Sequence, residues 1–302
     1  MRYKKEKNKL FILLFIMKKK IFIIGSKGFV GSYILKELKN SKFIKNKIIE
    51  LNRSKYDFKS KEFARFLTKN IRKNDIIVNA AAVAPCKNLL QFKENCDLIT
   101  NIHNSINKDL KVMIINISSD AIFPDFKGKI NEKLSLNPNS LHGLMHLMRE
   151  KIINLSSDNY LHLRPTLIYG YGDPHKGYGP NLFIKNILKN EEINLFGKGE
   201  EKRDHIHVED LSKLILLCIK KKVKGELNCV TGETISFYKI AKLIKKISGK
   251  KIKINFSKRL GPMPHNGYRP FDNKKIYKLF PNFKFSKLDE NLKKIIHKYE
   301  KK

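Results

Sequence analysis

Three glycines spaced three residues apart stand near the start of the chain, where an apolar run meets a helical pattern. Gly25, Gly28 and Gly31 follow the apolar run 21–24. The first glycine permits a tight turn, the second lets a pyrophosphate approach the backbone, and the third lets helix and strand pack closely. The N-terminus of the following helix attracts phosphate groups. This order of strand, loop and helix predicts a dinucleotide-binding site.

The residues after the next expected strand indicate which dinucleotide is bound. In such sites an acidic side chain at this position binds the adenosine ribose of NAD. Beyond the expected strand 48–51, this chain instead has Asn52 and Arg53. Arg53 suits the 2′-phosphate of NADP, although it can equally be a solvated loop charge. The expected cofactor is therefore NAD or NADP, with a tilt towards NADP.

The first half of the chain alternates short apolar runs with helical patterns. Strands are expected at 21–24, 48–51, 75–79, 111–117 and 160–168, and a long helix at 140–155. Strands that are apolar throughout are typical of a sheet covered by helices on both faces. The alternation favours right-handed βαβ units. The predicted fold class is α/β, with a Rossmann-like, doubly wound parallel sheet.

After Gly170 the sequence changes to a stretch rich in Gly, Pro and Tyr, which indicates a loop and a change of domain. Helices are expected near 182–188, 237–247 and 288–299, and a strand and helix through 205–219. We expect a dinucleotide-binding domain over 17–168 with returning segments near 204–230. A smaller, interleaved C-terminal domain, mainly 169–302, is expected to bind the substrate.

The N-terminal apolar run 11–17 is flanked by lysines on both sides. It is too short to span a bilayer, and no small-residue cleavage site follows it. Residues 1–16 are therefore expected to be a dispensable extension of a cytoplasmic protein with no membrane span.

The net charge of +35, from 63 Lys and Arg against 28 Asp and Glu, is the extreme feature of the composition. The charge runs along the whole chain without a focus, whereas nucleic-acid-binding modules concentrate it on one face. No nucleic-acid partner is expected, and the charge favours anionic small molecules. The four cysteines show no metal-like spacing and are expected to be free thiols.

Taken together, the motifs resemble the extended short-chain dehydrogenase/reductase superfamily, and more specifically the NAD-dependent epimerase/dehydratase family. The three-residue glycine spacing carries this likeness, together with the segments 79–82, 163–170 and 196–210. The last of these is close to the family's G-x-G-x-x-x-R-D-x-x-H-V-x-D. The segments 52–58 and 118–123 look most like the dTDP-4-dehydrorhamnose reductase branch.

The resemblance implies an epimerase or oxidoreductase that acts on a nucleotide sugar, a UDP- or dTDP-hexose, by hydride transfer through a keto-sugar, and that forms a homodimer. It places cofactor contacts at Gly25, Lys27, Gly28, Phe29, Val30, Gly31, Asn52, Arg53, Asp57, Phe58, Ala80, Ala81, Ala82 and His146, and substrate contacts at Asp120, Asn181, Leu182, Arg203 and Arg269. Guanidinium forks suit a diphosphate better than lysines do. The alternative for Arg203 is a structural ion pair with a neighbouring carboxylate.

The expected catalytic residues depart from the family pattern. Ser119 matches the family's hydroxyl residue, but His142 and His146 fall where the resemblance implies a tyrosine and a lysine. Histidine titrates near pH 6.5 unaided, so His142 needs no cationic partner to exchange a proton. A neutral His146 can keep a hydrogen bond to the cofactor ribose. Our hypothesis is that Ser119 positions the substrate oxygen while His142 exchanges its proton.

Three alternatives to this hypothesis stay open. His142 and His146 lie one helical turn apart and resemble half of a metal site, which His162, His175, His205 or His207 would have to complete. No HExxH-type spacing supports this, so no metal is expected. A reductase of 4-keto-sugars is the second alternative, and the third is a non-catalytic relative that still binds nucleotide and sugar.

Overall fold

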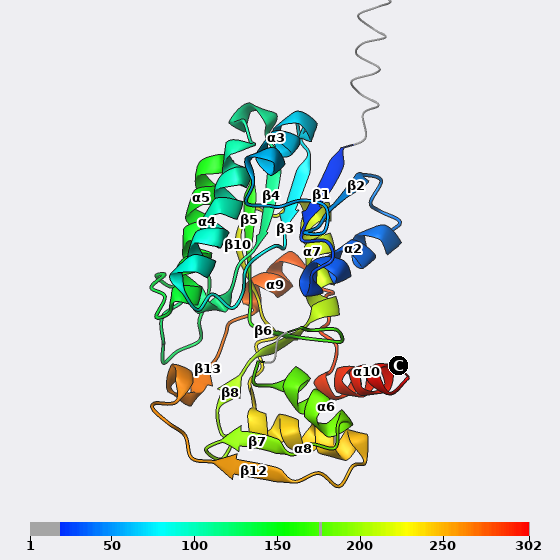
Figure 1. Ribbon diagram of the computed structural model, residues 1–302, viewed down its shortest axis with the longest axis vertical. Helices are drawn as coiled ribbons and strands as arrows, with labels where there is room; N and C mark the ends of the chain where they lie inside the picture. The colour runs from blue at the N-terminus through cyan, green and yellow to red at the C-terminus, as the bar shows by residue number, and fades with distance from the viewer. Residues whose placement is uncertain (1–18, 175–176, 302) are drawn as a thin grey trace, which may run out of the picture.

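The computed structural model describes residues 19–174 and 177–301 (Figure 1). The predicted extension 1–16 lies outside the described residues. The main sheet has six strands in the order β10-β5-β4-β3-β1-β2, and every neighbouring pair is parallel. These strands are β1 (Lys20–Ile24), β2 (Lys47–Leu51), β3 (Ile76–Asn79), β4 (Met113–Ile117), β5 (Tyr160–Pro165) and β10 (Gly225–Cys229). The strand order reverses between β1 and β3, and in such sheets ligands bind at the carboxyl ends of the strands beside this point.

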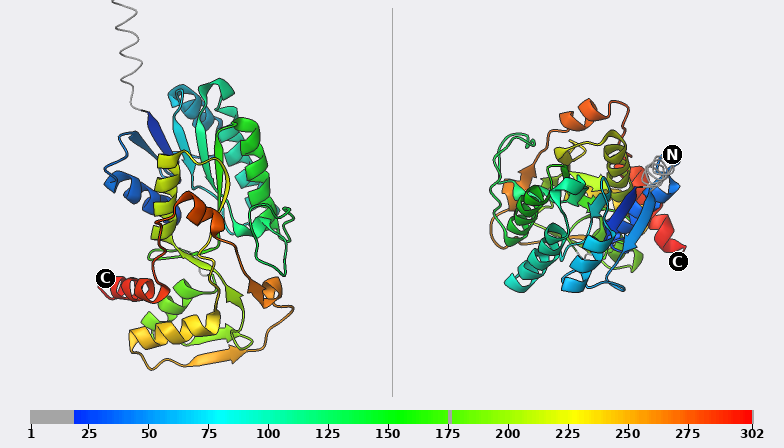
Figure 2. Two further views of the ribbon diagram at one scale, coloured as in Figure 1. Left: turned by 180° about the vertical axis from the view of Figure 1, so that it is seen from behind. Right: turned by 90° about the horizontal axis from the view of Figure 1, so that it is seen from above.

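Helices cover both faces of the sheet, as its apolar strands require (Figures 1 and 2). One face packs against α2 (Phe29–Asn40) and α7 (Val208–Lys221). The other packs against α3 (Lys61–Asn70), α4 (Leu89–Asn104) and α5 (Leu141–Ser156). The predicted Rossmann-like, doubly wound sheet is confirmed.

Polar side chains fix where the helices begin. Ser60, Asn88 and Ser140 each precede a helix, and each side chain accepts a hydrogen bond from a backbone N–H in the first turn. Such caps satisfy donors that the helix itself leaves unpaired. Ser140 accepts from the N–H of Gly143 at 3.1 Å and so sets the start of α5, the helix that carries both candidate histidines.

The expected single strand 160–168 is wrong in one respect, because the chain leaves the main sheet within it. β5 ends at Pro165, and β6 (Leu167–Tyr169) pairs instead with β9 (His205–His207). Between them the hydroxyl of Thr166 donates to Asp204 at 3.0 Å. Pro165 has no N–H to donate to a strand ladder, and Thr166 turns the chain towards the second lobe.

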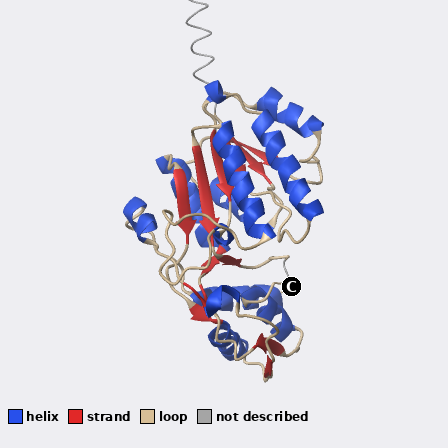
Figure 3. Cartoon of the chain, turned by 90° about the vertical axis from the view of Figure 1, so that its left-hand side faces the viewer, coloured by secondary structure: helices blue, strands red, loops and turns tan. Residues whose placement is uncertain are grey.

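The second lobe lies beyond the carboxyl ends of the strands (Figure 3). It contains α6 (Pro180–Leu188), β7 (Ile193–Phe196), β8 (Lys202–Arg203), β11 (Ile235–Ser236), α8 (Phe237–Ser248), β12 (Ile254–Ser257), β13 (Tyr268–Arg269) and α10 (Leu288–Glu300). A separate apolar core joins α6, α8 and α10. The chain returns to the main sheet through α7 and β10 between its visits to this lobe, so the two parts interleave. No helix of the described residues is long and apolar enough to cross a membrane.

Two buried histidines predict that the fold is sensitive to acid. Burial lowers the pKa of His162 to about 4 and that of His205 to about 3, whereas both titrate near 6.5 in an unfolded chain. Below pH 6.5 the unfolded state therefore binds more protons, and the free energy of unfolding decreases as the pH falls. His162 alone is expected to lower it by roughly 2 kcal/mol at pH 5.

Asp204 has the opposite effect on the free energy of unfolding as the pH falls, because burial raises its pKa to about 6. One such carboxylate only partly offsets two histidines. Denaturant unfolding at pH 7.5 and pH 5 measures the difference, and His162→Gln is expected to reduce it. Equal stability of the unmodified protein at both pH values would contradict the account.

Candidate active site

A cavity of about 1020 Å³ lies where the main sheet faces the second lobe. The glycine loop after β1 and the segment 80–82 after β3 line it. The loop after β4, the two histidines of α5, the start of α6 and Arg203 line it as well. The cavity therefore sits at the point where the strand order reverses.

The glycine loop has the geometry that its spacing predicts. Gly25 has φ +89°, a conformation that favours glycine, and a Cβ there would lie 2.9 Å from the backbone nitrogen of Ala81. A Cβ on Gly31 would lie only 2.1 Å from the carbonyl oxygen of Gly25. Gly28 lines the cavity at the N-terminus of α2, with no side-chain cap. The loop thus fits a dinucleotide pyrophosphate, since its backbone is open to an anion at a helix N-terminus.

The predicted contacts near the adenosine ribose are only partly brought together. Asn52 and Arg53 line the cavity, and the guanidinium of Arg53 donates to the carbonyl of Ala82 at 2.9 Å. Asp57 and Phe58 do not line it. Asp57 accepts from the backbone N–H of Lys59, and Phe58 is buried against the apolar core of α3 and α4. The turn after Asn52, in which two backbone N–H groups donate to its carbonyl, directs these two residues away.

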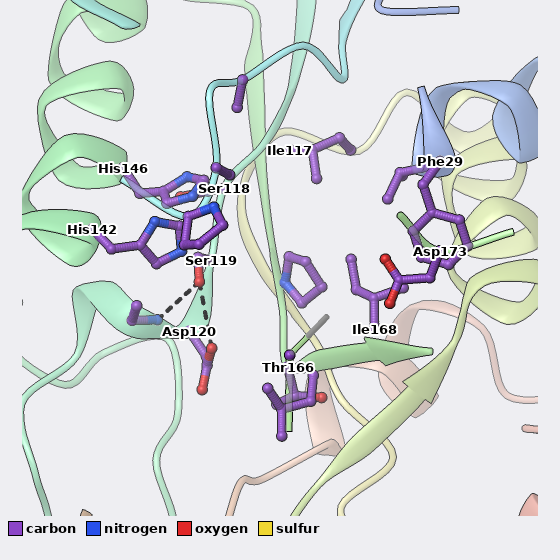
Figure 4. Close-up of a pocket in the computed structure, with 18 of the residues that line it drawn as sticks. Phe29, Ile117, Ser118, Ser119, Asp120, His142, His146, Thr166, Ile168 and Asp173 are labelled. Atoms are coloured by element: carbon purple, nitrogen blue, oxygen red, sulfur yellow. Dashed lines mark hydrogen bonds between the residues drawn. The ribbon is translucent and has the colours of Figure 1, made fainter. Parts of the chain in front are cut away.

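Ser119 stands at the end of β4, as predicted, and opens the short 3₁₀ helix η2 (Asp120–Ile122). Its hydroxyl oxygen accepts from the N–H of Ala121 at 3.1 Å and lies 3.4 Å from the carboxylate of Asp120. His142 and His146 project from α5 towards Ser119 (Figure 4). The structure therefore places the three candidate catalytic residues together in the lining of the cavity.

The two histidine rings pack edge to face, with centroids 4.7 Å apart. The backbone N–H of Cys86 donates to Nδ1 of His142 at 3.3 Å, so a neutral His142 carries its proton on Nε2. Burial, together with the charge of Arg149 and the proximity of His142, holds the pKa of His146 well below its usual range. His146 is thus uncharged at neutral pH.

Gly143 determines how closely α5 approaches Ser119. A Cβ at this position would lie 2.1 Å from the carbonyl oxygen of Ala121. Any larger residue would push the helix away from η2. The glycine between the two histidines therefore sets the distance between His142 and the Ser119 hydroxyl.

The two candidate diphosphate arginines lie in different surroundings. Arg203 lines the cavity, 3.6 Å from the carboxylate of Asp120 and 3.3 Å from that of Glu201. Arg269 is buried behind Asp120 and does not line the cavity. Its guanidinium donates to the Asp120 carboxylate at 3.2 Å and to the carbonyls of Asp120 and Phe123 at 2.8 and 3.0 Å. In this structure Arg269 supports the loop that carries Ser119, and only Arg203 faces the cavity.

Of the two remaining predicted substrate contacts, one lines the cavity and the other does not. Asn181 lines the cavity and accepts from the N–H of Gly170 at 3.1 Å. Leu182 packs with the apolar core of the second lobe instead. Among the described residues no group of three or more His, Cys, Asp or Glu side chains could hold a metal ion. His175 lies outside the described residues.

The sequence model of the NAD dependent epimerase/dehydratase family matches residues 21–230. The chain belongs to this family. Its membership agrees with the resemblance that the motifs indicated, and the family's dependence on a nicotinamide cofactor confirms the expected class, NAD or NADP.

Related proteins align with most of the length of this chain. It is 24% identical to an uncharacterized UDP-glucose epimerase of Bacillus subtilis, over 82% of this chain and 88% of the relative. It is also 24% identical to a GDP-L-fucose synthase of Dictyostelium discoideum, over 91% and 93% of the two chains.

Solved structures share its fold. A UDP-N-acetylglucosamine 4-epimerase of Methanobrevibacter ruminantium, in complex with UDP-N-acetylmuramic acid, matches with a TM-score of 0.76 and 19% identity, over 95% and 99% of the two chains. A dTDP-4-dehydrorhamnose reductase of Clostridium acetobutylicum matches with a TM-score of 0.72 and 21% identity, over 93% and 99%.

The glycine loop generates a prediction that separates binding from folding. Gly28→Ala places a methyl group in the path of the phosphates but meets only one backbone oxygen, at 3.2 Å. We expect a loss of cofactor affinity of about tenfold or more with less than about 1 kcal/mol change in unfolding free energy. Gly31→Ala should instead destabilise the fold by about 2 kcal/mol, because its methyl group clashes with Gly25.

Fluorescence titration with NADH or NADPH measures the binding, and denaturant unfolding measures the stability. Gly31→Ala serves as the comparison, since its methyl group meets the backbone of Gly25 in the same loop. A Gly28→Ala variant that binds both reduced cofactors as tightly as the unmodified protein would contradict the assignment of the loop.

Proposed function

We propose that the protein is an NAD(P)-dependent epimerase or oxidoreductase that acts on a nucleotide sugar, a UDP- or dTDP-hexose, through a keto-sugar. The continuous cavity carries this proposal. The phosphate loop at Gly25 and Gly28, the residue Arg203, and the candidate catalytic residues Ser119 and His142 all line this one cavity. A dinucleotide at one end and a nucleotide sugar at the other would meet at these two side chains.

The names of related proteins support this substrate class. They include an ADP-L-glycero-D-manno-heptose-6-epimerase of Brachyspira hyodysenteriae and a UDP-glucose 4-epimerase of Lactobacillus helveticus. A GDP-L-fucose synthetase of Naegleria fowleri is bound to NADP, and a UDP-glucose 4-epimerase of Thermus thermophilus is in complex with NAD. Their nucleotide bases differ, so they favour a class of substrate and not one sugar.

The chain's own residues would bind the two ligands at separate ends. Gly25 and Gly28 hold the dinucleotide pyrophosphate, and Asn52 with Arg53 lies at the adenosine ribose. Arg203 provides the fork that suits a sugar diphosphate, and Asn181 lines the same cavity at the start of α6. When bound, the nicotinamide supplies the hydride exchange at the sugar carbon.

Ser119 and His142 would handle the substrate oxygen and its proton. The hydroxyl of Ser119 orients the oxygen, and His142 exchanges the proton at Nε2, since its Nδ1 accepts from the N–H of Cys86. Because an imidazole is shorter than a phenol, either a bridging water or a substrate placed closer to α5 completes this contact. His146, which is neutral, would hydrogen-bond the ribose of the cofactor.

A second candidate function uses the same site and is favoured by the likeness of segments 52–58 and 118–123 to the dTDP-4-dehydrorhamnose reductase branch. A reductase of 4-keto-sugars, of the dTDP-4-dehydrorhamnose reductase type, uses the same hydride step in one direction and is compatible with this site. A relative that binds nucleotide and sugar without catalysis is favoured only by the replacement of the family's tyrosine and lysine. Reduction of bound NAD(P)⁺ on adding a UDP- or dTDP-sugar supports the enzyme, and saturable sugar binding without it supports the binding protein.

We further propose that the protein is cytoplasmic, since all four cysteines are free thiols. We also propose that it forms a homodimer, as the family resemblance implies. In this proposal residues 17–168 and the returning segments near 204–230 bind the dinucleotide, and 169–302 mainly bind the sugar nucleotide.

His142→Phe tests the proposed proton exchange. It keeps a ring of similar size on α5 but removes both nitrogens, so we expect kcat to fall on the order of 10²- to 10⁴-fold with little change in cofactor affinity. His297→Phe on the exposed side of α10 is the matched control and should leave kcat unchanged. Steady-state kinetics on the nucleotide sugar that reduces the bound cofactor measures both. Unchanged turnover of His142→Phe would remove His142 from the mechanism.

A further inference from the structure

Arg149 is a fully buried cation on α5 that no sequence motif indicates. Among the described residues no carboxylate forms an ion pair with it. The neighbouring Glu150 is engaged elsewhere, because both of its oxygens accept from Arg164, at 3.0 and 2.8 Å. Burying a charge without a counter-ion is costly, and strongly perturbed buried groups of this kind concentrate at functional sites.

The guanidinium of Arg149 joins α5 to the ends of two strands. One of its terminal nitrogens donates to the carbonyl of Ala81 at 2.8 Å and to the side-chain oxygen of Asn116 at 3.4 Å. The same oxygen of Asn116 accepts from the amide of Asn79 at 3.1 Å. Asn79, the last residue of β3, and Asn116, the last but one of β4, are partners in the sheet, so the guanidinium is linked to both strands.

These contacts lead directly to the cavity. Ala81 lines it, and Gly25 of the phosphate loop packs against the backbone of Ala81. His146 precedes Arg149 by three residues on the same helix and therefore lies on the same face. The cation thus stands behind both the cofactor loop and the histidine pair.

We propose that Arg149 is a positioning residue of the active site, which fixes the segment 80–82 against α5 and supplies the positive charge of the site behind the two histidines. The proposal rests on the proposed function in one respect, namely that the nicotinamide lies beside His142 and His146, in front of Arg149. Its charge persists at neutral pH, since burial lowers the pKa of Arg149 only to about 10.

A fixed cation at this place has two consequences. It opposes a second positive charge on His146, whose pKa is lowered by burial, by Arg149 and by His142, so His146 stays neutral. It also opposes the positive charge of an oxidised nicotinamide but not the neutral reduced ring. Arg149 should therefore favour NAD(P)H over NAD(P)⁺ in the site.

Cofactor affinities separate an electrostatic role from a merely structural one. Arg149→Met removes the charge and keeps the length, Arg149→Lys keeps the charge, and Lys151→Met removes an exposed charge from the same helix. Loss of the Ala81 contact alone would lower the affinities for oxidised and reduced cofactor equally. We expect Arg149→Met also to shift the NADH-to-NAD⁺ affinity ratio towards NAD⁺ on the order of tenfold, the effect of removing one nearby like charge at the effective dielectric of a protein.

Arg149→Lys and Lys151→Met should keep the ratio of the unmodified protein within about twofold, a range well inside the tenfold effect expected of one buried charge. A ratio unchanged in Arg149→Met would overturn the electrostatic role. If Arg149→Met does not fold, the lysine variant decides, because a ratio shifted in the presence of the retained charge contradicts the proposal.

Histidine titration by NMR tests the same charge without any cofactor. In the unmodified protein we expect His146 to stay neutral well below pH 6.5, and Arg149→Met to raise its titration midpoint while Lys151→Met does not. A His146 that titrates at or above pH 6.5 in the unmodified protein contradicts the proposal. This titration does not depend on the substrate. A protein that turns over no nucleotide sugar would therefore refute the proposed function but not the role of Arg149.

Discussion

The contact between Arg269 and Asp120 joins the two lobes at the wall of the cavity. The guanidinium comes from the second lobe and holds both the carboxylate and the carbonyl of Asp120, which follows β4 of the main sheet. A buried fork with several acceptors is a strong and directional interaction. The loop it holds carries Ser119, receives α5 through the close packing at Gly143, and presents Asp120 to Arg203. The contact therefore helps to fix both the hydroxyl and the second lobe relative to the sheet.

The sequence predicts local elements well where the backbone geometry admits only a few residue types. The strand β1, the loop at Gly25 and Gly31, and the helix after it follow from close backbone contacts that only glycine permits. The start of α5 follows from the serine cap at Ser140. In each case the information lies within a few residues of the feature.

What the sequence does not reveal depends on contacts between distant segments. The strand over 160–168 divides because Thr166 binds Asp204, which lies 38 residues away. The guanidinium of Arg269 turns away from the cavity because the loop after β4 offers it three backbone carbonyls and two carboxylates. Arg149 has no local signal, since its partner Ala81 lies 68 residues away. A motif can name a residue type, but the tertiary fold decides what the side chain faces.

The central claim is that a nucleotide sugar meets the cofactor at Ser119 and His142. A crystal structure of the protein with NAD⁺ and a UDP- or dTDP-sugar bound tests this most directly. Our account predicts a sugar hydroxyl within hydrogen-bond distance of the Ser119 hydroxyl, with Nε2 of His142 reaching the same oxygen directly or through one water. A sugar whose reacting oxygen contacts neither side chain, with its diphosphate away from Arg203, would contradict it.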